Sequence, residues 1–141
     1  MVKRGVLYVV WGEFNSVALE RSRQSLARVH PDIPVEVIEL AAGSTLLDKA
    51  RMMELSPFEE TLFLDADTVV LDDLCYGFQQ MRRFGLACSI CECPWARRYG
   101  GLSGDMVEYN TGVLFFSKAA RPVFNAWKAC ATEVDSSIIF H

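Results

Sequence analysis

Two aspartates, Asp65 and Asp67, stand two residues apart at the end of an apolar run, and no other residues in this sequence are better suited to chemistry. Alternate residues of an extended chain share a face, so both carboxylates are predicted to point the same way. At about 5 Å and an effective dielectric of about 20, two such anions repel by roughly 3 kcal/mol. A cation or a shared proton relieves that repulsion. Mg²⁺ and Mn²⁺ favour one or two protein carboxylates with substrate phosphate oxygens completing the shell, so we expect such an ion here, carrying phosphate.

Strands and helices are expected to alternate along the chain around these aspartates. Continuous apolar runs or period-two alternation predict strands, and an apolar stripe among charged residues predicts a helix. The predicted strands cover residues 5–10, 35–40, 60–64, 86–91 and 112–116, and the predicted helices cover residues 16–29, 46–55, 74–84 and 119–132. This order indicates an open α/β sheet with helices on its faces. Residues 92–108 show neither periodicity and are expected to form a long surface loop.

The strand ends indicate where a ligand would bind. In open α/β sheets, ligands bind beyond the carboxyl ends of the strands. Asp65 and Asp67 directly follow one predicted strand, and Trp11 and Gly12 follow the first. We therefore expect these two separate segments to meet at one crevice.

Composition restricts the class of protein. The chain has 141 residues, of which 51% are hydrophobic and 23% charged, which is typical of one folded domain spanning residues 1–141. A formal charge of -4 without a long Lys/Arg block argues against sequence-independent nucleic-acid binding. The first apolar run, residues 5–10, is too short for a signal-peptide core or a membrane span. We therefore expect a cytoplasmic protein without a transmembrane segment, of unknown oligomeric state.

Cysteines offer a second metal hypothesis. Without a secretory signal, the five cysteines are expected to be reduced thiols. If the alternation of the predicted strand is continued to position 93, Cys88 faces opposite to Cys91 and Cys93, and no Cys-x-x-Cys partner lies elsewhere. This geometry disfavours zinc and favours buried small hydrophobic residues.

Two motifs resemble those of a known enzyme class. Residues Leu62–Leu74 read LFLDADTVVLDDL, and residues Tyr109–Phe116 read YNTGVLFF. The first is similar to the Asp-x-Asp segment, and the second to the Phe-Asn-Ser/Ala-Gly-Val strand, of glycosyltransferases with the GT-A fold. The resemblance is greatest to the retaining glycogenin-like and galactosyltransferase-like enzymes, which use nucleotide-diphosphate sugars. It implies a Rossmann-like open mixed sheet, mostly parallel, with helices on both faces. It also implies metal-dependent hexosyl transfer from a UDP-sugar to an unknown glycan, protein or lipid acceptor.

The same resemblance implies roles for individual residues. Asp67 would bind Mn²⁺ or Mg²⁺ directly, while Asp65 would share the metal and reach the ribose or sugar hydroxyls. The ion would bridge both phosphates and stabilise the departing nucleoside diphosphate. Asn110 offers an amide to the donor sugar, and Gly112 lets the backbone approach closely. The remaining candidates are Val10, Trp11 and Gly12, which would line the base and ribose pocket, and Lys49, which would neutralise phosphate.

Part of the family pattern is missing from this sequence. Family members continue with an Asp-Gln segment facing the acceptor and a His-x-x-Gly-x-x-Lys segment whose histidine completes the metal shell, and neither is present. We therefore expect a chain truncated at its C-terminus, whether a fragment, a truncated product or a reduced form.

Two alternative functions stay open. Asp65-Ala66-Asp67-Thr68 also fits the Asp-x-Asp-x-Thr signature of haloacid-dehalogenase-like phosphatases, in which Asp65 would attack phosphorus and Asp67 would act as general acid and base. The other alternative is a non-catalytic nucleotide-sugar-binding remnant. Turnover assays on a phosphoester and on a nucleotide sugar separate the three hypotheses.

Overall fold

Five strands and four α-helices make up the computed structural model, which describes residues 3–91 and 107–131. The strands are β1 (Arg4–Val10), β2 (Val35–Glu39), β3 (Glu60–Leu64), β4 (Leu86–Ile90) and β5 (Tyr109–Ser117). The helices are α1 (Ser16–Val29), α2 (Met52–Leu55), α3 (Cys75–Phe84) and α4 (Arg121–Ala131), with 3₁₀ helices at η1 (Leu46–Arg51) and η3 (Lys118–Ala120). Every predicted element is present. Helix α1 and strand β3 have the predicted ends, the predicted helix over residues 46–55 is η1 followed by α2, and the other elements have shifted ends. Apart from residues 107 and 108, the predicted loop over residues 92–108 lies outside the described residues.

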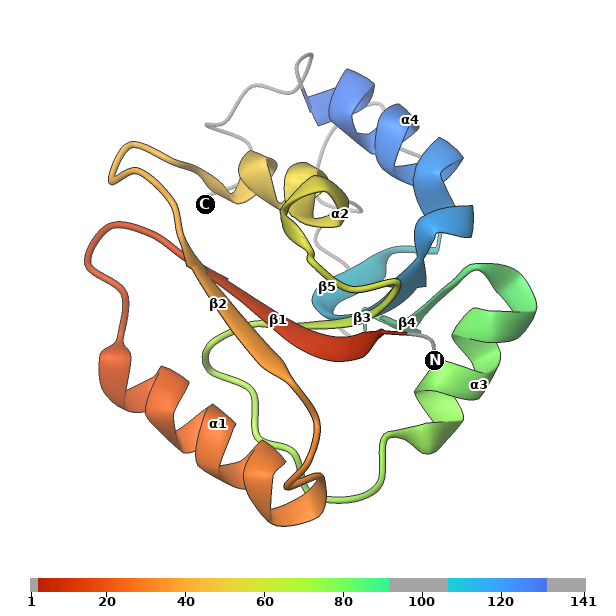
Figure 1. Cartoon of the computed structure of the whole chain (residues 1–141). Coiled ribbons are helices and arrows are strands. Elements are labelled where there is room, and N and C mark those ends of the chain that lie inside the picture. The colour runs from red at the N-terminus through yellow and green to blue at the C-terminus, as the bar shows by residue number, and fades with distance from the viewer. Residues whose placement is uncertain (1–2, 92–106, 132–141) are drawn as a thin grey trace.

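The strands form one sheet in the order β2-β1-β3-β5-β4 (Figure 1). β1 pairs in parallel with β2 and β3, and β5 runs antiparallel to both β3 and β4. Only β5 is therefore reversed, and the sheet is mixed and mostly parallel in strand direction. The fold class expected from the resemblance is confirmed.

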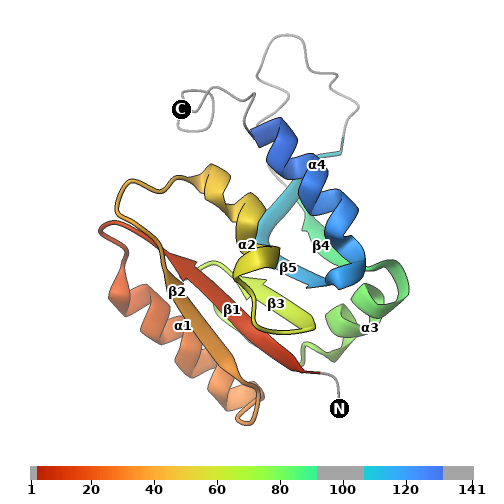
Figure 2. The same ribbon diagram turned by 45° about the horizontal axis from the view of Figure 1, so that its top comes forward.

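Helices cover both faces of the sheet. Figures 1 and 2 show α1 and α3 on one face and α2 and α4 on the other. Alternate residues of β1 divide between the two layers, so Tyr8 packs with the α1 and α3 side chains while Leu7 packs with those of α2 and α4. Both are fully buried. A strand buried on both faces has no polar side, which explains why β1 reads as an unbroken apolar run. Within the described ranges, none of the helices has the length and apolar character needed to cross a membrane.

A buried carboxylate holds the start of β3. Glu60 is 7% exposed and accepts hydrogen bonds from Arg4 at 2.9 and 3.0 Å and from Arg82 at 2.6 and 3.0 Å. The Arg4 guanidinium also lies 4.3 Å from the centre of the Phe78 ring. The hydrogen bond from Arg82 is the main reason why the pKa of Glu60 lies below its ordinary value of 4.5, and burial opposes this shift. A carboxylate with a lowered folded pKa stabilises the protein above the unfolded pKa, and that contribution is lost as pH falls through the folded pKa.

Glu60→Gln is expected to lower the free energy of unfolding by about 2 kcal/mol at pH 7, because both arginines lose a charged acceptor. The variant should also lose less stability than the wild type as the pH falls below the ordinary glutamate pKa of 4.5. Urea denaturation from pH 7 to pH 3 measures both effects. Glu59→Gln, an exposed neighbour, is the matched control. Parallel pH profiles for Glu60→Gln and the wild type would contradict the prediction.

Candidate functional site

A cavity of about 290 Å³ opens at the carboxyl ends of β1 and β3. It is formed by the end of β1 and the residue after it, the start of α1, η1 and the turn after β3. Its lining residues are Val9, Val10, Trp11, Phe14, Asn15, Ala18, Leu46, Lys49, Asp65, Ala66 and Asp67. The structure therefore brings the segments after β1 and β3 together, because these strands are parallel neighbours whose ends meet at one edge.

The two aspartates lie in a turn and not in an extended segment. β3 ends at Leu64, and the backbone N–H of Thr68 donates to the carbonyl of Asp65 at 3.1 Å. The assumption that alternation along a strand aligns Asp65 and Asp67 is therefore wrong, because Asp favours turns through local hydrogen bonds. Both residues nevertheless line the same cavity, Asp65 half-buried and Asp67 exposed.

The carboxylate of Asp65 already has a cation from the same chain. Lys49 Nζ lies 2.6 Å from Oδ1 and 2.8 Å from Oδ2 of Asp65, and the lysine side chain is only 8% exposed. Lys49 was predicted as a phosphate ligand, and the structure places it on a carboxylate. In residues 3–91 and 107–131, the carboxylate of Asp67 has no hydrogen bond or ion pair. Two carboxylates and one ammonium leave the cavity with one uncompensated negative charge.

A bulge in β5 brings Asn110 and Gly112 next to Asp65. Cys88 pairs with Leu114 but the next residue, Ser89, pairs with Asn110, so residues 111–113 have no partner on β4. The Asp65 N–H donates to the Gly112 carbonyl at 2.8 Å, and the Gly112 N–H donates to Asn110 Oδ1 at 2.7 Å. Bulges frequently redirect side chains beside functional sites. Here the bulge places the Asn110 side chain close to the carboxylate of Asp65.

Gly112 leaves the space that this arrangement needs. A Cβ atom at Gly112 would lie 2.9 Å from Asp65 Oδ2 and 3.1 Å from Asn110 Oδ1. Gly112→Ala is therefore expected to displace the Asp65 carboxylate and weaken its ion pair with Lys49. The free energy of unfolding should fall by about 1 kcal/mol. Denaturant titration measures this change. Gly43→Ala is the control, since a Cβ there meets nothing within 4 Å. Equal stabilities of the two variants would contradict the steric explanation.

Only some of the other predicted site residues line this cavity. Val10 and Trp11 line the cavity, whereas Gly12, Asn110 and Gly112 are not among its lining residues, and Asn110 lines a second cavity. Sequence reasoning missed the residues from the start of α1. Asn15 caps that helix by accepting from the Ala18 N–H at 3.0 Å. An asparagine directly before the predicted helix over residues 16–29 is a helix-start signal, and this signal could have placed Asn15 beside the crevice.

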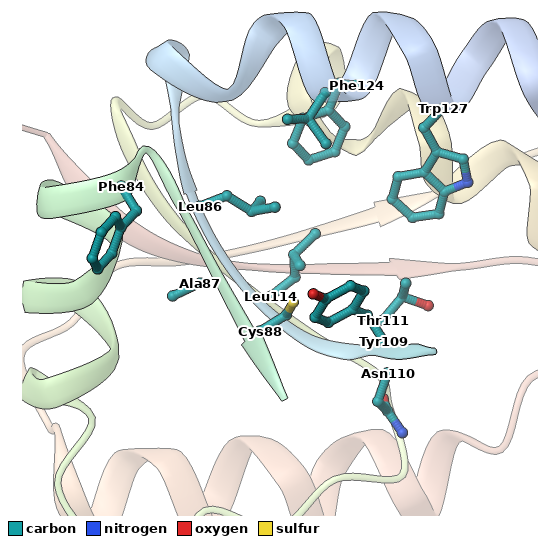
Figure 3. A pocket seen from close by; sticks show the side chains of 11 residues that line it. Phe84, Leu86, Ala87, Cys88, Tyr109, Asn110, Thr111, Leu114, Phe124 and Trp127 are labelled. Atoms are coloured by element: carbon teal, nitrogen blue, oxygen red, sulfur yellow. The ribbon is translucent and has the colours of Figure 1, made fainter. Parts of the chain in front are cut away.

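A second and larger cavity, of about 580 Å³, lies between α4 and strands β4 and β5 (Figure 3). Its lining residues are Phe84, Leu86, Ala87, Cys88, Tyr109, Asn110, Thr111, Leu114, Val123, Phe124 and Trp127. In Figure 3, Phe84 stands at one end of the cavity and Asn110 at the other. None of these lining side chains is an acid, a lysine or an arginine, so the cavity offers no compensation for an anion. The smaller cavity is the better candidate for a charged ligand.

The donor set of the smaller cavity fits a hard divalent ion. Carboxylate oxygens are the ligands that Mg²⁺ and Mn²⁺ prefer, and Asp67 presents one without a counter-charge. No group of three or more His, Cys, Asp or Glu residues able to hold an ion occurs in the described part of the chain. An ion on Asp65 and Asp67 would therefore take its remaining ligands from substrate oxygens and water, as Mg²⁺ usually does.

Comparisons with known proteins identify the fold. No protein-family model matches the chain, and no curated protein sequence matches it significantly. Among solved structures, the chain is similar to the glycosyltransferase GlyE of Streptococcus pneumoniae TIGR4, with a TM-score of 0.61 and 17% identity. It is also similar to the galactosyltransferase LgtC in complex with donor and acceptor sugar analogues, with a TM-score of 0.53 and 13% identity. A third similar structure is 2-C-methyl-D-erythritol 4-phosphate cytidylyltransferase from Thermus thermophilus, with a TM-score of 0.53 and 16% identity.

These similarities cover almost all of this chain but differ in their share of the other protein. The match spans 97% of this chain and 40% of GlyE, 96% and 63% for LgtC, and 94% and 79% for the cytidylyltransferase. The chain thus has the GT-A, or nucleotide-diphospho-sugar transferase, fold, as the two sequence motifs indicated. At identities below 20%, the similarity identifies a fold shared by enzymes of different reactions, and it does not identify a reaction.

Proposed function

We propose that the chain binds a nucleotide-diphosphate sugar together with Mn²⁺ or Mg²⁺ in the cavity of Asp65, Asp67 and Lys49, as the donor site of a glycosyltransferase. One observation carries this proposal. At the edge where β1 and β3 end, the Asp67 carboxylate has no partner in the described residues while Asp65 is paired with a buried lysine. Two such strand ends form the usual ligand edge of an α/β sheet.

Charge balance explains why a diphosphate and a divalent ion suit this cavity together. Asp65, Asp67 and Lys49 leave one negative charge, which repels a diphosphate by itself. A bound divalent ion makes the site net positive, and it supplies the charge that stabilises a departing nucleoside diphosphate. Lys49 Nζ has three N–H groups, of which one donates to Asp65 Oδ2 at 2.8 Å, and the same nitrogen lies 2.6 Å from Oδ1. In the described part of the chain Lys49 has no other hydrogen-bond acceptor, so a remaining N–H can donate to a phosphate oxygen.

Two further side chains, Asn110 and Trp11, could contact the sugar and the base of the donor. Asn110 Oδ1 accepts from the Gly112 N–H, which leaves the amide NH₂ to donate to a sugar hydroxyl. Trp11, half-buried at the end of β1, offers an indole face to the base or ribose. The acceptor and the sugar stay unassigned.

Isothermal titration calorimetry with UDP tests the binding proposal. We expect heat of binding with Mn²⁺ or Mg²⁺ present and none after chelation with EDTA. Titration with CDP under the same conditions tests the base. Equal affinity with and without metal would remove the metal-bridge model.

Turnover assays then separate the reaction classes. Sugar transfer or hydrolysis from a UDP-hexose supports a glycosyltransferase, and phosphate release from p-nitrophenyl phosphate supports a phosphatase with Asp65 as nucleophile. Pyrophosphate release from CTP with a phosphorylated alcohol would indicate a nucleotidyltransferase, because one structure of similar fold is a cytidylyltransferase. Metal-dependent binding without turnover supports a non-catalytic binding remnant.

A further inference from the structure

Four hydroxyl side chains connect the core to the turn that carries the aspartates. Tyr8, Ser22 and Ser25 are each 0% exposed, in the apolar layer between the sheet and α1. The Tyr8 hydroxyl lies 2.9 Å from Ser22 Oγ, and Ser22 Oγ lies 3.1 Å from Thr68 Oγ1. Thr68 Oγ1 in turn donates to the carbonyl of Asp65 at 2.8 Å. These contacts join β1, α1 and the segment after β3 through side chains far apart in the sequence.

The direction of every hydrogen bond in this series can be deduced. A hydroxyl group has a single proton to donate. Thr68 gives its proton to the Asp65 carbonyl, so Ser22 must donate to Thr68, and Tyr8 must therefore donate to Ser22. Burial raises the pKa of Tyr8 above its ordinary value, which keeps the proton that this order requires. Each hydroxyl in the series therefore donates to the next residue toward the turn, and the last one donates to the carbonyl oxygen of Asp65.

Ser25 holds the segment beyond the turn. Its hydroxyl donates to the Ser22 carbonyl at 2.6 Å and accepts from the Val70 N–H at 2.8 Å. The turn itself has the Thr68 N–H donating to Asp65 O at 3.1 Å. Asp67 lies inside this turn and its carboxylate has no partner of its own among the described residues. The position of Asp67 therefore depends on the hydrogen bonds on either side of it.

We propose that Tyr8, Ser22, Ser25 and Thr68 are positioning residues that fix the Asp65–Thr68 turn against α1 and so direct the Asp67 carboxylate into the cavity. For the effect on ligand affinity, the proposal rests on the proposed function. For the effect on the turn, it stands independently. Removing a group that orients a metal-binding side chain typically lowers metal affinity by about 10- to 100-fold.

Thr68→Val and Thr68→Ser form the decisive pair of variants. Valine keeps the shape of threonine but has no hydroxyl, whereas serine keeps the hydroxyl and loses a methyl group. Amide hydrogen exchange at position 68 is the first readout, because this N–H donates within the turn. We expect at least about tenfold faster exchange in Thr68→Val and near-wild-type exchange in Thr68→Ser. The second readout, affinity for UDP with Mn²⁺, should fall about tenfold in Thr68→Val only.

The deduced proton order ranks the remaining variants. Ser22→Ala removes the donor to Thr68 but leaves the Thr68 bond to Asp65, so its effect should be smaller than that of Thr68→Val. Tyr8→Phe leaves Ser22 able to donate, so its effect should be the smallest of the three. A reversed ranking would overturn the proton order.

Thr61→Val is the matched control. Thr61 is 0% exposed, lies on the same strand as the residues before the turn, and pairs its hydroxyl with Ser56 Oγ at 2.6 Å. Thr61→Val also replaces a threonine hydroxyl by a methyl group, but away from the turn. We therefore expect a lower melting temperature without faster exchange at Thr68 or weaker UDP affinity. Unchanged exchange at position 68 in Thr68→Val, or equal changes in Thr61→Val, would overturn the positioning proposal. If UDP binds no variant, the wild type included, the proposed function fails while the exchange measurement still decides the positioning role.

Discussion

Asp67→Asn is expected to weaken metal-dependent binding of UDP at least about 100-fold, which corresponds to about 2.7 kcal/mol. Asparagine keeps the size of aspartate but removes its charge. In the described part of the chain, Asp67 is the cavity carboxylate without a counter-charge, whereas Asp65 is already neutralised by Lys49. Loss of the Asp67 charge therefore leaves an approximately neutral pair with little attraction for a divalent ion.

The fold should tolerate this replacement, because Asp67 is exposed and forms no described hydrogen bond. Calorimetry with UDP and Mn²⁺ measures the affinity, and a thermal melt confirms that the variant is folded. Asp32→Asn, an exposed aspartate remote from the cavity lining, is the matched control for net charge. Wild-type affinity in Asp67→Asn would show that Asp67 does not hold the ion.

Lys49→Met is expected to strengthen binding of free Mn²⁺ about tenfold and to weaken binding of UDP with Mn²⁺ by a similar factor. The ammonium of Lys49 occupies both oxygens of Asp65, so it competes with an ion for the same carboxylate. Its removal leaves two uncompensated anions, which attract Mn²⁺ more strongly. The same removal deletes the N–H that we assign to a phosphate oxygen.

The two opposite signs distinguish this model from simple loss of structure. Methionine fills the buried space of the lysine stem, and the charge pair that it breaks is partly screened because the Asp65 side chain is 31% exposed. We therefore expect a loss of stability of about 1 kcal/mol. Lys118→Met, on an exposed lysine at the end of β5, is the control. If metal and nucleotide affinities fall together, Lys49 does not compete with the ion.

Much of the fold could be predicted because its signals are local. The unbroken apolar run of β1 required burial on both faces, and α2 and α4 on one side with α1 and α3 on the other provide it. The proline near the start of α4 and the glycine that ends α3 likewise mark element ends through backbone geometry alone. The Asp-x-Asp motif and the Asn-x-Gly-Val strand indicated the GT-A fold that structural similarity identifies.

The candidate site was only partly predictable, because its key contacts join separate segments. Lys49 is 16 residues from Asp65, and their ion pair depends on how η1 packs beside the end of β3. Gly112 was predicted to let the backbone approach closely, and only the structure shows that the carboxylate of Asp65 lies in the space that a side chain at this position would need. The assumption of an extended chain through Asp67 was wrong, because β3 ends at Leu64, before both aspartates, and the chain then turns.

The sequence by itself determined which residues form strands and helices and which acidic pair follows a strand, because periodicity and turn preference act over a few neighbouring residues. Only the tertiary structure decided which of the two carboxylates keeps a free charge, which hydroxyls hold their turn, and which helix end completes the cavity. Those outcomes depend on strand order, pairing register and the β5 bulge. Each is set by packing and hydrogen bonds between segments that no local pattern relates to one another.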